Sequence, residues 1–148
     1  MKARFVIHEH HATNLHFDLR LEIGGVLKSW AVPKGVSMNP ADKRLAIEVP
    51  DHSLSYIDFE GTIQEGNYGA GVVVSWDKGE FETENEAVLQ LENGRLNFIF
   101  HGAKLRGAFS LRKMTGRKNQ WLIIKSADEF AVKNWKLETV LPPKSKKI

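Results

Sequence analysis

Apolar and polar residues alternate along several short stretches of this 148-residue chain, and this period of two limits the folds that it can adopt. The clearest case is LHFDLRLEI, in which Leu15, Phe17, Leu19 and Leu21 occupy every second position. Successive side chains of a β-strand point to opposite faces, so these apolar residues share one face and the polar residues share the other. The pattern predicts an all-β protein whose strands each contribute one face to a core.

Turn residues separate these stretches. Gly24-Gly25 predicts a tight hairpin turn, Pro50 should end the strand before it, and Asn93-Gly94 is a strong hairpin signal. DKG at 77–79 predicts a further turn. Strands are expected at 4–10, 15–23, 26–32, 44–49, 71–76, 80–82, 107–114 and 121–125, with a hairpin within 88–100 and helical character only around 87–91 and 128–135. Many short strands favour a small closed or nearly closed β-barrel, or a sandwich, with one or two short helices.

Composition excludes several classes of protein. No stretch approaches the ~18 consecutive apolar residues of a membrane span, and the N-terminus lacks the apolar segment of a signal peptide. Since there is no cysteine, any metal would be held by histidine and carboxylate, and no nucleophile would be a thiol. A net charge of +3 is compatible with a polyanionic partner without identifying one. We expect a cytoplasmic monomer without a membrane partner, with one domain at 1–141 and a flexible basic tail at 142–148.

The segment HEHHATNLHFDLRLE concentrates groups that bind metals and phosphates. His16, Asp18 and Arg20 must share the strand face opposite the apolar stripe. If the preceding strand pairs back with His10 opposite His16, the two histidines and Asp18 form a two-histidine, one-carboxylate set with open positions. Such a set suits Mn, Zn, Fe or Co. A register shift of one residue would turn His10 to the other face, so the prediction depends on the register.

The surroundings of this set fit a ligand site. Ser29 and Ala31 are expected opposite the polar face of the histidine-bearing strand, and their small side chains leave room. His8 and nearby carboxylates could orient the ligand imidazoles from behind. For His8 and His11 taken singly, an ordinary hydrogen-bonded histidine is the simpler interpretation. For the whole segment, the alternative to a site is a polar surface hairpin.

Further cations and donors suit phosphate chemistry. Arg20 has the planar fork that matches a phosphate, Lys34 follows a strand in a loop, and Arg44 begins a strand. His52 could donate to a phosphoryl oxygen or act as a general acid, and Tyr56 could donate its hydroxyl. Singly, solvation explains the two loop and strand cations, and core packing explains the tyrosine. The glycine-rich EGNYGAG lacks the pattern of a nucleotide-binding loop, and no motif for a covalent nucleophile is present.

Three segments, HEHHATNLHFDLRLEIGGVLKSWAVPKG, KRLAIEVPDHSLSYIDFEGTIQEGNYGAG and WLIIKSAD, resemble the 3′-end-healing phosphoesterase domain of the bacterial DNA ligase D family, in its free-standing form. The resemblance runs from Arg4 to about Asp128. The spacing H-x5-H-x-D-x-R, combined with D-H-x3-Y, makes it specific. It implies a small β-barrel with a crescent-shaped active-site groove, and Mn²⁺ as cofactor with Co²⁺ or Zn²⁺ as alternatives.

The resemblance also implies an activity. Family members remove a terminal ribonucleoside from a DNA or RNA 3′ end, leave a 3′-phosphate, and hydrolyse it to a hydroxyl. By motif, the catalytic residues are His10, His16 and Asp18 as metal ligands, Arg20, His52 and Tyr56 on the phosphate side, and Lys34 and Arg44 as supporting phosphate-binding positions. The expected setting is DNA repair by non-homologous end joining, with a separate DNA ligase and polymerase as partners.

Two differences from the family stand out. The chain begins shortly before its first strand, where family members commonly carry a further segment, and Pro50 stands where the family often has glutamate in V-E-D-H. Hydrolysis of the 3′-phosphate is the step expected to suffer more. Two other functions stay open: a small-molecule metallo-phosphodiesterase, and a non-catalytic barrel that binds nucleic-acid ends. The latter would need exposed aromatic residues for stacking, whereas the four tryptophans fall mostly on apolar stripes.

Overall fold

The computed structural model describes residues 2–142, so nearly all of the predicted basic tail at 142–148 lies outside the described residues. No helix in this part of the chain is long and apolar enough to cross a membrane. The elements are β1 (Lys2–His11), β2 (Leu15–Ile23), β3 (Val26–Val32), β4 (Arg44–His52), the 3-10 helix η1 (Leu54–Asp58), β5 (Gly61–Ile63), β6 (Gly71–Glu82), α1 (Ala87–Glu92), β7 (Arg95–Gly102), β8 (Arg106–Lys113) and β9 (Gln120–Lys125).

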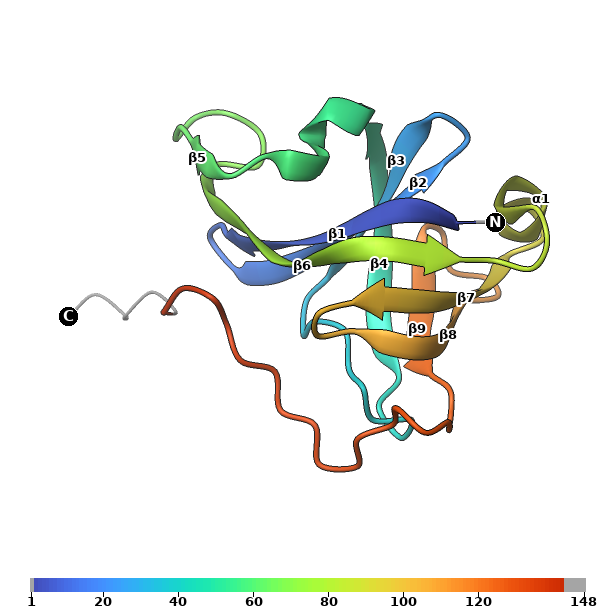
Figure 1. Ribbon diagram of the computed structural model, residues 1–148. Coiled ribbons are helices and arrows are strands. Elements are labelled where there is room, and N and C mark those ends of the chain that lie inside the picture. The colour runs from blue at the N-terminus through green and yellow to red at the C-terminus, as the bar shows by residue number, and fades with distance from the viewer. Residues whose placement is uncertain (1, 143–148) are drawn as a thin grey trace.

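The strands form one antiparallel sheet that closes on itself (Figure 1). Its order is β1-β2-β3-β4-β9-β8-β7-β6-β5, and a further pairing of β1 with β6 completes a ring of eight strands, with β5 added beside β6. Closure leaves no free edge within the ring, which is how small antiparallel proteins avoid unpaired strands. The predicted all-β fold and closed barrel are confirmed, and the sandwich is not formed.

The apolar stripe of β2 faces the barrel interior. Phe17, Leu19 and Leu21 are buried in one cluster with residues from all seven other strands of the ring, including Phe5 and Trp30. Leu19 lies opposite Trp30 across the β2–β3 pair, as the alternation predicted. The polar residues of β2 therefore lie on the outer face of the barrel, where a second, smaller apolar cluster forms beneath η1.

The register that the metal prediction required is present. β1 pairs with β2 so that His10 lies opposite His16, and β3 sets Ser29 opposite Arg20 and Ala31 opposite Asp18. Because the pairing has a period of two, this register brings the predicted ligands onto one face.

Two predicted strand ends are wrong. β4 continues through Pro50 to His52, because one extra residue of β4 bulges between the pairs Leu27–His52 and Ser29–Val49, and a proline is tolerated at such an irregularity. β6 runs unbroken from Gly71 to Glu82, without a turn at 77–79. In place of that turn, the pairing with β1 shifts register between Ile7 and His8, which is a β-bulge.

Two local signals were also misread. Asn93-Gly94 does not join two strands: it ends α1, and Gly94 leads into β7 with a φ of 78°. The expected helix at 128–135 is absent, and turns and irregular backbone occupy this stretch. Tertiary hydrogen bonds hold it instead, since Val132 N–H donates to the Met38 carbonyl and the Asp128 carboxylate accepts from the backbone of Ala108.

The segment after β9 returns to the barrel and docks on a buried carboxylate of β1. Glu9 is 0% exposed, and its oxygens accept hydrogen bonds from Val140 N at 2.6 Å, Leu141 N at 2.8 Å and His11 Nε2 at 2.7 Å. A buried carboxylate is tolerated because each oxygen is hydrogen-bonded. The C-terminal segment thus clamps the end of the strand that carries His10.

Glu9→Ala is expected to lower the free energy of unfolding by about 2–4 kcal/mol, because it leaves two backbone N–H groups and an imidazole without their acceptor. Urea unfolding followed by tryptophan fluorescence measures this loss. The matched control is Glu84→Ala at an exposed position, which should change the value by no more than about 0.5 kcal/mol. Equal midpoints for the two variants would contradict a clamping role for Glu9.

Candidate functional site

A cavity of about 320 Å³ opens on the outer face of β1 and β2, beneath the connection between β4 and β6. Its volume is at the lower end of the range for small-molecule sites. The lining residues come from five strands (β1–β5), from the turn between β1 and β2, from η1 and from the glycine-rich loop: His10, Ala12, His16, Asp18, Arg20, Ala31, Val49, Pro50, His52, Tyr56, Ile63, Tyr68 and Gly69. Six of them are the predicted catalytic residues, which the fold brings together in one place.

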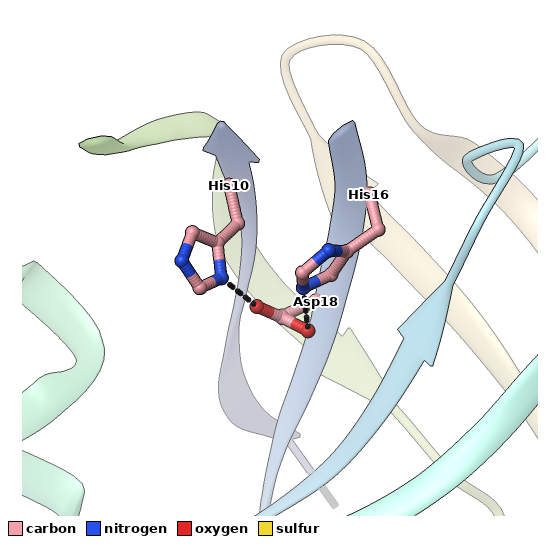
Figure 2. A group of neighbouring side chains, drawn as sticks. All are labelled: His10, His16 and Asp18. Atoms are coloured by element: carbon pink, nitrogen blue, oxygen red, sulfur yellow. Dashed lines mark hydrogen bonds and ion pairs between the residues drawn. The ribbon is translucent and has the colours of Figure 1, made fainter. Parts of the chain in front are cut away.

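His10, His16 and Asp18 form the core of this site (Figure 2). The Nδ1 of His10 lies 3.3 Å from one Asp18 oxygen, and the Nε2 of His16 lies 3.2 Å from the other. The candidate donor atoms all lie within 4.8 Å of one another. Two ligands of one divalent ion lie about 3 Å apart, since each bond is about 2.1 Å long, so the two histidine–carboxylate distances match those around a shared metal ion.

The outer nitrogen of each histidine contacts a backbone carbonyl. His10 Nε2 donates to the Gly69 oxygen at 2.7 Å, and His16 Nδ1 donates to the Asn14 oxygen at 3.1 Å. A neutral imidazole has one N–H, so the lone pairs of both inner nitrogens then point toward the Asp18 carboxylate. Three electron-pair donors facing one another require a cation between them, either a proton or a metal ion. The donor set thus fits a divalent metal, with backbone carbonyls rather than spare carboxylates orienting the ligands.

The charges of the site agree with this arrangement. Burial acts to raise the pKa of Asp18, but its contacts with His10 and His16 and the nearby Arg20 charge hold that pKa well below its ordinary value. For His16, burial acts to lower the pKa, but the hydrogen bond and charge of Asp18 outweigh it and raise the pKa. Asp18 is therefore a carboxylate at neutral pH, the form that binds a cation.

Each of the three side-chain nitrogens of Arg20 has a partner. Its Nε donates to His8 Nδ1 at 3.0 Å, one terminal nitrogen donates to Ser29 Oγ at 2.9 Å, and the other lies 3.4 Å from Asp18 Oδ2. Its guanidinium carbon lies 5.1 Å from the centre of the Tyr56 ring. A guanidinium carries five N–H groups, so these three contacts leave two for a ligand in the cavity.

His52 and Tyr56 form an aromatic wall beside Arg20. Their rings stack at 4.5 Å, and Tyr56 stacks in turn on Phe59 at 4.8 Å. Burial, and then the Arg20 charge, lower the pKa of His52, while burial raises the pKa of Tyr56. Both side chains are therefore neutral at neutral pH, and each can donate one hydrogen bond to a phosphoryl oxygen.

The two supporting cations do not line this cavity. Lys34 is exposed in the loop after β3. Arg44 is an odd number of residues from Val49 along β4, so it points to the opposite strand face, and it lies 3.4 Å from Asp42. Their role in phosphate binding stays a prediction, because neither side chain lines the cavity.

The sequence did not single out Tyr68, and it assigned His8 a different partner, because His8 was expected to orient the ligand imidazoles and instead contacts Arg20. Burial and the Arg20 charge lower the pKa of His8 to about 3, so it is neutral and can accept the Arg20 N–H. Tyr68 lines the cavity from a loop that was read only as a bend. The predicted register already set His8 on the face of His10, whereas no local pattern brings Tyr68 to the site. His11 lies on the other face, bonded to Glu9.

Comparison with known proteins agrees with the geometry. The family model for the "DNA Ligase D 3'-phosphoesterase domain" matches residues 8–113, which is more than half of the chain. The chain belongs to the DNA ligase D 3′-phosphoesterase family. The matched segment begins at His8 and includes each predicted metal ligand and phosphate-side residue.

Relatives of this 3′-phosphoesterase domain are long multifunctional proteins. It is 46% identical over 127 residues to the multifunctional non-homologous end joining protein LigD of Pseudomonas aeruginosa, covering 84% of this chain and 15% of that protein. Identity to the protein of the same name from Mycolicibacterium smegmatis is 43% over 132 residues, covering 85% of this chain and 17% of that protein. The multifunctional non-homologous end joining DNA repair protein LigD of Mycobacterium tuberculosis is 39% identical over 138 residues, covering 93% of this chain and 18% of that protein. The chain thus spans less than one fifth of these relatives.

Addition of Mn²⁺ is expected to raise the melting temperature of this phosphoesterase domain. At about 100 times its dissociation constant, the ion adds about 2.7 kcal/mol, or roughly 5–10 °C for a chain of this size. Asp18→Asn should abolish that rise because it removes the shared carboxylate. The control Asp58→Asn, which changes an exposed partner of Lys78, should keep it. Differential scanning calorimetry measures both, and a full rise in Asp18→Asn would argue against this site.

Proposed function

We propose that this protein is a metal-dependent 3′-phosphoesterase that heals DNA or RNA 3′ ends. It would remove a terminal ribonucleoside, leave a 3′-phosphate, and then hydrolyse that phosphate to a hydroxyl. The observation that carries the proposal is the union, in one cavity, of a metal-ligand triad with an arginine that keeps two N–H groups for a ligand. Membership of the DNA ligase D family supports the reaction class, and the names of the relatives support a role in end joining.

The metal proposed for the triad is Mn²⁺, with Co²⁺ or Zn²⁺ as alternatives that the ligand set also accepts. A divalent ion there would act as a Lewis acid on a phosphoryl oxygen and lower the pKa of a water molecule or of the ribose 2′-hydroxyl. His10, His16 and Asp18 supply one ligand atom each. The carbonyls of Gly69 and Asn14 accept hydrogen bonds from the two imidazoles and so keep them oriented toward the metal position.

Arg20, His52 and Tyr56 would receive the phosphate. Arg20 offers its remaining N–H groups to two oxygens, and its bonds to His8 and Ser29 fix the orientation of the fork before the substrate arrives. His52 and Tyr56 each donate one hydrogen bond from the adjoining wall. Such preorganised donors stabilise the charge that develops on the phosphoryl oxygens in the transition state.

Pro50 bears on the second reaction. It lines the cavity at the position where the family often has glutamate, so the chain offers no carboxylate there. Removal of the 3′-phosphate is the step that this difference is expected to weaken. A DNA ligase and a polymerase are the proposed partners, since a healed 3′-hydroxyl is what both of these enzymes require.

The deciding experiment uses a 5′-labelled primer on a template. The primer ends in one or two ribonucleotides, and it is incubated with and without Mn²⁺. Shortening to a 3′-phosphate and then to a 3′-hydroxyl, in metal only, is the expected result, and His10→Ala should abolish it while the protein stays folded. In the primer with two terminal ribonucleotides, the nucleotide before the scissile phosphate carries a 2′-hydroxyl, whereas in the primer with one it does not. The ratio of the two cleavage rates therefore tests whether this hydroxyl participates.

Other outcomes point to other functions. Arrest at the 3′-phosphate would limit the activity to the first step. Cleavage of a small phosphodiester without any effect of polymer length would favour the small-molecule phosphodiesterase. No shortening with Mn²⁺, Co²⁺ or Zn²⁺ would overturn the enzymatic proposal and favour a barrel that only binds ends.

Arg20→Lys tests the phosphate-binding half of the site. Lysine keeps the charge but loses the planar fork, so kcat/KM should fall by about 100-fold or more. Binding of Mn²⁺, measured by calorimetry, should change little because the three ligand atoms remain. Loss of metal binding together with activity would mean instead that Arg20 acts by holding Asp18 in place.

A further inference from the structure

Tyr68 is the most exposed of the large hydrophobic residues in the described part of the chain, and it also lines the cavity. It is 88% exposed, whereas the other large aromatic side chains of the cavity are packed in a stack. A ring at the edge of a ligand site can contact what binds there, and such a contact removes its apolar faces from water.

The loop that carries Tyr68 is anchored at the metal site. The carbonyl of the next residue, Gly69, accepts the hydrogen bond from His10 Nε2 at 2.7 Å. Gly69 has a φ of 77°, a left-handed conformation that favours glycine, and a Cβ there would lie 3.6 Å from the His10 ring. Further bonds, from Asn67 N to the Gln64 carbonyl and from Ala70 N to the Asn67 carbonyl, make two turns of the loop. These bonds hold the backbone of the loop beside His10, and Tyr68 lines the cavity from there.

The composition of the cavity separates two kinds of contact. The metal triad and Arg20 offer charge to a phosphate, while Ile63 and Tyr68 offer apolar surface on the loop side. A nucleoside attached to that phosphate carries a flat base, and every base has a face that an aromatic ring can stack on. A phosphate alone would leave the ring of Tyr68 without a partner.

We propose that Tyr68 stacks on the base of the 3′-terminal nucleoside and so forms a base-binding subsite of this phosphoesterase. The terminal base has one stacking neighbour in the strand, so it leaves the stack at the lowest cost. The subsite rests on the proposed function, because a base is present only when the substrate is a nucleic-acid end. Since any base can stack, it selects a nucleoside over a bare phosphate without selecting a sequence.

The kinetic test compares two primers that differ only in whether the terminal ribonucleoside carries its base. Tyr68→Ala should raise KM about tenfold on the base-bearing primer with little change in kcat, and should not alter the use of the abasic primer. Tyr68→Phe keeps the ring and should behave as wild type. Glu65→Ala, an exposed residue of the same loop that does not line the cavity, is the matched control. Equal losses of Tyr68→Ala on both primers would overturn stacking and leave a loop-positioning effect on His10.

A binding test separates failure of this subsite from failure of the proposed function. The probe is a primer with 2-aminopurine as its terminal base, titrated with protein in Mn²⁺ and, separately, in EDTA. Quenching of its fluorescence by the wild type and Tyr68→Phe, and not by Tyr68→Ala, supports stacking even if no primer is cleaved. Equal fluorescence changes with all three proteins, or none with any of them, would overturn the subsite, whatever the activity.

Discussion

The Asp18 carboxylate lies nearly buried and contacts three basic side chains at once: His10, His16 and Arg20. A buried carboxylate without partners would cost several kcal/mol, so the folded state depends on these neighbours staying in contact with Asp18. Each neighbour is in turn oriented from behind, the two histidines by backbone carbonyls and the arginine by His8 and Ser29. This network joins the candidate metal ligands to the proposed phosphate-binding side of the cavity.

Strand β1 serves two different purposes on its two faces. On the outer face His8 and His10 join the site, while on the other face Glu9 receives the C-terminal segment and His11. The bulge between Ile7 and His8 in the pairing with β6 comes where the polar part of the strand begins. The position of His10, a candidate metal ligand, therefore depends on packing from both sides, and the strand is buried from Phe5 to His11.

Period-two reasoning succeeded where one strand meets its sequence neighbour. The alternation of β2 predicted which residues enter the core, and the hairpin over Gly24-Gly25 brought Ser29 and Ala31 to the expected partners. It failed where a local signal competed with long-range pairing: β4 passes through Pro50 at a bulge, and β6 passes through 77–79 because β1 pairs along its whole length. Turn propensities are weak beside a ladder of tertiary hydrogen bonds.

The sequence by itself determined the all-β class, and it singled out the candidate metal ligands and the predicted phosphate-side residues that line one cavity, because strand alternation and motif spacing are local properties. Only the tertiary structure decided which cations enter the cavity, and it leaves Lys34 and Arg44 outside its lining. Only the tertiary structure also brought Tyr68 and Gly69 beside His10, since they are separated from it by almost sixty residues and meet it through the closure of the barrel. Contacts of such separation depend on how strands pair in space, which no short window of sequence encodes.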